Sequence, residues 1–99
     1  MKVLIEGHKY LLENFENKSE GQVIQFMEKS FQLGLTYIVD GTTNEEVLEM
    51  LIDRMQVLRD KLPSKETSCC ITHLEEALMW LEKRTKDRIK RGVEGKHLA

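Results

Sequence analysis

The chain has 99 residues, which is enough for one small domain and too few for two. Its hydrophobic content of 40% is typical of a globular protein, and no apolar run has the length that a bilayer span requires. The net charge of −2 gives no sign of a general nucleic-acid binder. No stretch resembles a signal peptide, so we expect a cytoplasmic protein that forms a single domain over residues 1–99.

The first 40 residues predict a β region. Residues 2–15 alternate imperfectly between two faces and predict one strand, which residues 16–21 end in a turn. Residues 21–29 also alternate and predict a second strand, paired with the first as a β-hairpin. The stretch FQLGL reads as irregular, and residues 35–41 predict a short third strand that ends at an Asp-Gly pair.

Residues 41–99 predict an antiparallel helical hairpin. Thr43 and Glu46 have the spacing of a capping box, Pro63 stops the first helix after about residue 61, and Ser64 is placed to cap the second. The second helix runs on through residues 73–95 and ends in a glycine. The expected apolar stripes are Val47, Leu51, Met55, Leu58 and Leu62, with Leu48 and Ile52 beside them, and Leu74, Ala77, Leu78 and Leu81.

The predicted fold class is therefore α+β, with an N-terminal antiparallel β-hairpin region followed by a two-helix antiparallel hairpin. Apolar side chains occupy more than one face of the helices, and Met79 and Trp80 lie off the second stripe. A domain of this size cannot cover all of them itself. We therefore expect the protein to be oligomeric, and at least a dimer.

The C-terminal part of the second helix is basic. Residues 83–99 hold seven Lys or Arg and two acids, a net charge of +5, and the expected apolar stripe stops at Leu81. Arg84, Arg88 and Arg91 recur at i, i+4 and i+7 and share one helix face, one turn after Trp80. Guanidinium groups beside an aromatic ring suit phosphates and bases. On composition alone, a solvated helix end whose cations complement the helix dipole explains the pattern at least as well.

No residue pattern predicts catalysis, a cofactor or a metal site. His8, His73 and His97 have no metal-ligand spacing with one another or with the adjacent Cys69 and Cys70. No serine has a nucleophile-elbow context, and no glycine-rich phosphate loop precedes a helix. We therefore do not expect an enzyme.

The segments TNEEVLEMLIDRMQ and KETSCCITHLEEALMWLEKRTKDRIKRGVEG resemble the helical hairpin of the phage Thoeris anti-defence protein one family. That hairpin is shared with the phage anti-CBASS cyclic-oligonucleotide sponge. The resemblance covers about residues 41–97, and the N-terminal β segment is similar more weakly. It implies a non-enzymatic protein, encoded by a phage or prophage, that acts in the cytoplasm of the bacterial host. Such proteins sequester immune signals uncleaved, namely cyclic ADP-ribose isomers and in some members cyclic di- or trinucleotides, and assemble as dimers and hexamers.

The resemblance also implies a ligand site. Arg84 and Arg88 match the two arginines that the family uses on its signal molecule. The asparagine that contacts ligand in the family is Thr67 here, and its stacking aromatic ring falls at or beside Val57, where no ring is present. Arg91 and the RGVEG segment are expected to close the pocket. Because Arg84 and Arg88 lie beyond the expected apolar stripe, we expect their replacement by alanine to leave folding nearly unchanged.

Two other functions stay open at this point. The basic helix could serve as a phosphate rail for nucleic acid, or the protein could be a structural oligomer without a ligand. A rail prefers polymers and weakens steeply with salt, whereas a pocket saturates at a fixed ratio with one small ligand. The residues do not indicate which signal nucleotide is bound.

Overall fold

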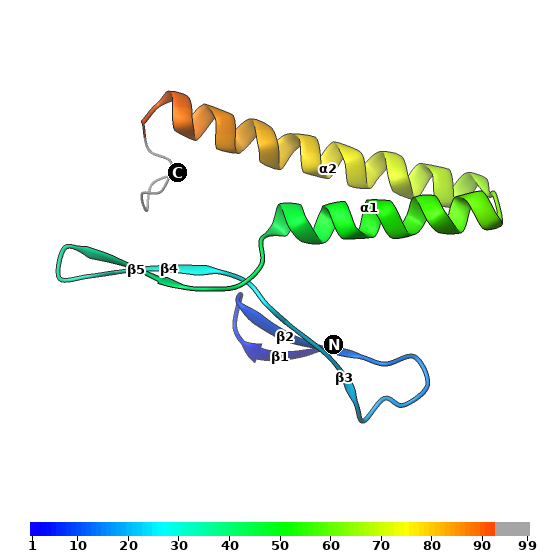
Figure 1. Cartoon of the computed structure of the whole chain (residues 1–99), viewed down its shortest axis with the longest axis horizontal. Helices are drawn as coiled ribbons and strands as arrows, with labels where there is room; N and C mark the ends of the chain where they lie inside the picture. Colours follow the sequence, from blue (N-terminus) through cyan, green and yellow to red (C-terminus); the bar gives the residue numbers. More distant parts are fainter. Residues whose placement is uncertain (93–99) are drawn as a thin grey trace. The chain divides into compact units, whose positions relative to one another are not determined.

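The structure, a computed structural model, describes residues 1–92. Within that range the chain forms five antiparallel strands in two small sheets, followed by two helices (Figure 1). The predicted α+β class is confirmed. The strands belong to one compact unit, Met1–Thr43, and the helices to a second that begins at Asn44. No helix of residues 1–92 is both long and apolar enough to cross a membrane.

The first sheet has the order β1-β2-β3, with β1 at Lys2–Ile5, β2 at Lys9–Glu13 and β3 at Gly21–Gln25. The predicted β-hairpin is confirmed by the antiparallel pairing of β2 with β3. The single strand expected over residues 2–15 is wrong, because the chain turns back on itself between β1 and β2. Gly7 lies in this turn with φ of 75°, a conformation that glycine adopts without a steric penalty.

The second sheet is a two-stranded hairpin of β4, Glu28–Gln32, and β5, Leu35–Val39. The third predicted strand is confirmed as β5, but the stretch expected to be irregular forms the end of β4, the turn and the start of β5. Leu33 and Gly34 have φ of 52° and 75°, which is the pattern of a two-residue type I′ turn.

The continuous strand expected over residues 21–29 is also wrong, because β3 ends at Gln25 and β4 begins at Glu28. Between them the chain pairs with the segment that precedes the first helix. The backbone N–H of Thr42 donates to the carbonyl of Gln25 at 2.8 Å, and that of Met27 donates to the carbonyl of Thr42 at 2.9 Å. These bonds come from a segment about 16 residues away in the chain, so local alternation could not predict them.

The helices are α1, Asn44–Lys61, and α2, Lys65–Lys90. The bounds of α1 agree with the prediction. Ser64 caps α2 as expected: its Oγ accepts a hydrogen bond from the backbone N–H of Thr67 at 3.1 Å. The helix ends earlier than residue 95, because Gly92 already has φ of 72°, and a glycine in this conformation is a common helix terminator. Gly95 lies outside the described residues.

The two helices run side by side as an antiparallel hairpin (Figure 1). Ile71 is the most buried apolar side chain of residues 1–92, with 2% exposed. It begins a row on α2 that repeats at alternate steps of three and four residues, as in a coiled coil. The row is Ile71, Leu74, Leu78, Leu81, Thr85 and Arg88, and each member is buried or half-buried. The apolar part of the row ends at Leu81 as expected, but the row of covered side chains continues through Thr85 to Arg88.

On α1 the half-buried apolar residues are Leu48, Ile52 and Met55, with Val47 also partly covered. The expectation that Leu51, Leu58 and Leu62 form the buried stripe is wrong, since all three are exposed. Apolar residues occupy most of the circumference of α1, so their spacing alone could not indicate which sector faces α2. The hairpin consequently retains a second apolar sector that α2 does not cover.

Candidate functional site

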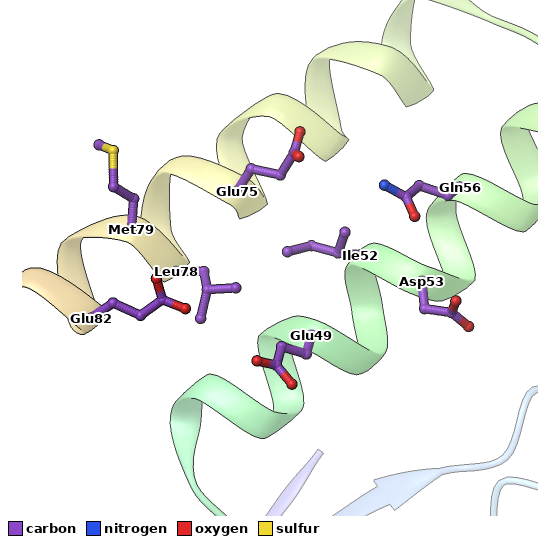
Figure 2. A pocket seen from close by; sticks show the side chains of 8 residues that line it. All are labelled: Glu49, Ile52, Asp53, Gln56, Glu75, Leu78, Met79 and Glu82. Atoms are coloured by element: carbon purple, nitrogen blue, oxygen red, sulfur yellow. The ribbon is translucent and has the colours of Figure 1, made fainter.

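A groove runs along one side of the helical hairpin and is acidic (Figure 2). Its volume is about 360 Å³, and Ile52, Leu78 and Met79 form its apolar part. The remaining lining residues are Glu49, Asp53, Gln56, Glu75 and Glu82, four of which are carboxylates. Carboxylates repel phosphates, so this groove does not suit an anionic nucleotide. None of the predicted site residues lines it.

The opposite side of the hairpin exposes several apolar side chains. At 3.6 residues per turn, Leu51 and Leu58 lie roughly 150° and roughly 170° around α1 from the centre of the groove-lining row. The same arithmetic places Ala77 and Arg84 on the corresponding side of α2. We call this surface the apolar face; its exposed apolar members are Leu51, Leu58, Leu62, Cys70 and Ala77, and the exposed Arg54 and Glu66 lie on the same side. Arg84 lies at one end of it.

Arg84 and Arg88 lie on adjacent turns at the same end of α2, but their environments differ. Arg84 is exposed, whereas Arg88 is 5% exposed and its Nη1 atom is enclosed by the protein. The expectation that both arginines lie beyond the buried stripe is therefore wrong for Arg88, because Arg88 is the last member of the row that faces α1. Arg84 presents the accessible guanidinium, and Arg88 places a second positive charge just beneath the surface.

The other cations at this end of α2 are exposed. Arg91 is the C-cap residue, and its backbone N–H donates to the carbonyl of Asp87 at 3.0 Å. Lys83 forms an ion pair with Asp87 at 3.0 Å. Trp80, one turn before Arg84, is 62% exposed and could stack on a planar ligand. The part of the RGVEG segment after Gly92 lies outside the described residues.

Thr67 and Val57 lie far from the arginines within one chain. Thr67 is in the first turn of α2 and Arg84 is 17 residues further along, which is about 25 Å of helix at 1.5 Å per residue. The hydroxyl of Thr67 accepts a hydrogen bond from Ser64 Oγ at 2.8 Å. Val57 is 46% exposed on the second half of α1 and has no ring to stack. The five predicted site residues therefore fall into two groups at opposite ends of the hairpin.

This arrangement can attract an anion to the Arg84 end of α2. Among residues 1–92, no three His, Cys, Asp or Glu side chains gather in a way that could hold a metal ion. The feature that sequence reasoning missed is the acidic groove. Its signal was present in the spacing of Glu49, Asp53 and Gln56, which share one side of α1.

Comparison with known proteins identifies the hairpin. Residues 27–86 match the family described as Acb2/Tad1, hairpin domain. The chain is also similar to Thoeris anti-defense 1 of Bacillus phage SBSphiJ7, with 45% identity over 71 residues that cover 69% of this chain and 50% of that protein. The chain thus spans about half the length of this curated relative. The match covers β4, β5, α1 and most of α2, which confirms the resemblance seen in the sequence, and the chain belongs to the Acb2/Tad1 hairpin family.

Proposed function

We propose that this protein counters Thoeris defence by binding an immune signalling nucleotide and sequestering it unchanged. The similarity to a phage protein named Thoeris anti-defense 1 supports the biological role. The observation that supports the mechanism is the cationic end of α2, where exposed Arg84 and Arg91 lie on either side of buried Arg88. The ligand class is a cyclic ADP-ribose isomer, with cyclic di- or trinucleotides as the wider class, so CBASS is a second target.

The charge distribution supports a small anionic ligand at this end of the helix. The groove side of the hairpin carries four carboxylates, whereas the Arg84 end is positive. A guanidinium can donate two parallel hydrogen bonds to one phosphate group. Buried Arg88 is surrounded mostly by protein, which has a lower dielectric constant than water. Solvent and salt therefore screen its attraction for an anion bound at Arg84 less than they screen the attraction of an exposed charge.

Thr67 and Arg84 belong to one site only if the site lies between copies of the protein. Within one chain they are about 25 Å apart, which exceeds the reach of a ligand of two or three nucleotides that must also be enclosed. Two hairpins packed in opposite directions bring the first turn of α2 of one copy beside the last turns of α2 of the other. Arg84, Arg88 and Arg91 of one copy would then hold phosphates, and Thr67 and Val57 of the partner would face the ribose or base.

Sequestration without chemistry places two demands on the protein. Sites must be at least as numerous as signal molecules, and binding must be tight; nanomolar affinity corresponds to about −12 kcal/mol. A site closed by two copies meets the second demand better than an exposed helix end, because it removes more of the ligand from water.

Isothermal titration of the full chain with a panel of signal nucleotides tests the proposal. Replacing Arg84 by alanine removes hydrogen bonds to a charged group, each contributing roughly 1.5–3 kcal/mol, so binding should weaken by on the order of 10- to 100-fold. Lys86→Ala is the matched control, because Lys86 is also exposed and cationic but lies on the groove side of α2. If Arg84→Ala and Lys86→Ala lose affinity equally, and a nucleic-acid polymer binds more tightly than the small nucleotides and with a strong salt dependence, the basic helix instead binds nucleic acid through its phosphates.

A further inference from the structure

Trp80 is a large aromatic side chain that the packing of the helical hairpin leaves uncovered. It is the only tryptophan of the 99 residues, and 62% of it is exposed. At 3.6 residues per turn, it lies roughly 130° around α2 from the centre of the row that faces α1. Tryptophan is highly buried on average in folded proteins, so the contact between α1 and α2 does not explain its presence here.

Trp80 is the middle member of a row of three exposed residues on α2. Glu76, Trp80 and Arg84 recur at steps of four residues, so they follow one side of the helix at intervals of about 6 Å along its axis. We call these three residues the outer row. It presents a carboxylate, an aromatic ring and a guanidinium, in that order.

The order of these groups matches the order of the chemical groups in a nucleotide. A phosphate accepts paired hydrogen bonds from a guanidinium, and a base has a flat face that stacks on an aromatic ring. Adenine and cytosine also carry an exocyclic amine, which donates a hydrogen bond to a carboxylate. Glu76 and Arg84 are separated by about 12 Å of helix, and their long side chains can reach toward a nucleotide that lies across Trp80.

The residues beside the outer row preserve its charge polarity. The carboxylate of Asp87, one turn beyond Arg84, forms an ion pair with Lys83 at 3.0 Å, so its charge opposes a phosphate at Arg84 less. At the other end, Glu76 Oε2 lies 3.8 Å from His73 Nδ1, and 56% of the Glu76 side chain is exposed. The potential along the row therefore favours a ligand whose phosphate points toward Arg84 and whose base points toward Glu76.

We propose that Trp80 stacks on the base of the signal nucleotide and that Glu76 accepts a hydrogen bond from the exocyclic amine of that base. This inference rests on the proposed function, because it adds a base-binding part to the site whose phosphate-binding part is Arg84. The five residues expected to form that site include no aromatic ring. Residues 41–99 contain no Phe, Tyr or Trp other than Trp80, so it is the one such ring that the helical segment can offer to a base.

Fluorescence of the full chain tests the stacking directly, because the chain has a single tryptophan. The probes are a cyclic ADP-ribose isomer with a free adenine amine, its hypoxanthine counterpart, and inorganic pyrophosphate. Each nucleotide should quench the emission of Trp80 and protect it from acrylamide over the same concentrations at which calorimetry detects binding. Pyrophosphate has no base and should do neither.

Two variants of Trp80 and one control measure the contribution of the ring. Trp80→Leu removes the ring and should weaken binding of the adenine probe by about 5- to 150-fold, whereas Trp80→Phe keeps a ring and should retain most of the affinity. Met79→Leu is the matched control, because Met79 is the adjacent exposed residue but lines the groove. Both positions are exposed, so thermal melting without nucleotide should stay close to that of the wild type.

The pair of nucleotide probes tests the role of Glu76. Hypoxanthine carries a carbonyl oxygen in place of the amine of adenine, so the wild type should bind the adenine probe at least about tenfold more tightly. A glutamine amide can both donate and accept, so Glu76→Gln should bring the two affinities close together. Equal affinities of the wild type for the two probes would overturn the role of Glu76.

The remaining outcomes separate this inference from the proposed function. Binding of the adenine probe without a change in Trp80 emission, or with equal affinity for Trp80→Leu and the wild type, would overturn the stacking and leave sequestration standing. Emission that is already shielded from acrylamide in the free protein would also overturn it, because another surface would then cover Trp80. Absence of binding for every nucleotide would overturn the proposed function and this inference together.

Discussion

Arg88 allows the stability of the helical hairpin to be separated from its affinity for ligand. Arg88 is the last member of the row on α2 that faces α1, and 5% of it is exposed. Truncation to alanine removes the aliphatic stem from this packing and should cost about 1–3 kcal/mol. For a domain of this size, 1 kcal/mol corresponds to about 4–8 °C in Tm, so Arg88→Ala should lower Tm by roughly 5–20 °C.

Arg88→Met is the informative companion to this variant. Methionine keeps the length of the buried stem and removes the charge, so it separates the packing of the stem from the charge of Arg88. We therefore expect Arg88→Met to melt at a higher temperature than Arg88→Ala, because it keeps the packing of the stem, while its affinity for the signal nucleotide falls. Arg84→Ala, at an exposed position, should change the free energy of unfolding by less than about 0.5 kcal/mol.

Thermal unfolding followed by circular dichroism, without nucleotide and at one protein concentration, measures these effects, because ligand and assembly both shift Tm. Equal Tm values for Arg84→Ala and Arg88→Ala would contradict the buried role of Arg88. A loss of stability for Arg88→Met as large as that for Arg88→Ala would show that the charge, and not the packing of the stem, holds the end of the hairpin together.

Three further outcomes follow from the structure. Nucleotide released by heat denaturation should be chromatographically identical to the nucleotide added, and a cleaved product would reject sequestration in favour of catalysis. Ser64→Ala should lower the free energy of unfolding by about 1 kcal/mol, because it removes the cap of α2, and a thermal melt matching the wild type would count against that role. Ile71→Ala should cost about 2–5 kcal/mol in denaturant unfolding, and a cost below that of Ser64→Ala would contradict the position of Ile71 in the core.

The elements that local signals define were predictable from the sequence. The capping serine, the proline after α1 and the apolar spacing placed α1 and the start of α2 correctly. The strand break between β3 and β4 was missed because it depends on non-local pairing: the chain leaves the first sheet after Gln25, where Met27 bonds to Thr42. The turn at Gly7 was missed because the imperfect alternation on either side of it looked like one strand.

The candidate site was predictable only in part. The spacing of Arg84, Arg88 and Arg91 correctly places the three residues at one end of α2, but it could not show that Arg88 is buried, because that depends on which sector of α2 faces α1. The grouping of Thr67 with the arginines came from resemblance to a family. Thr67 and the arginines lie at opposite ends of α2. Residue spacing within one chain carries no information on whether a second copy brings them close together.

The order in which the elements contact one another bears on how quickly the protein can form. Apart from the bridge of Phe26 with Thr42, the contacts between elements in residues 1–92 join neighbours in the chain: β1 with β2, β2 with β3, β4 with β5 and α1 with α2. Short sequence separation keeps the entropy of loop closure small, and chains rich in such contacts fold in microseconds to milliseconds. We expect each unit to be complete soon after synthesis, so that the encounter of two chains proposed above, which depends on concentration, becomes the slow step.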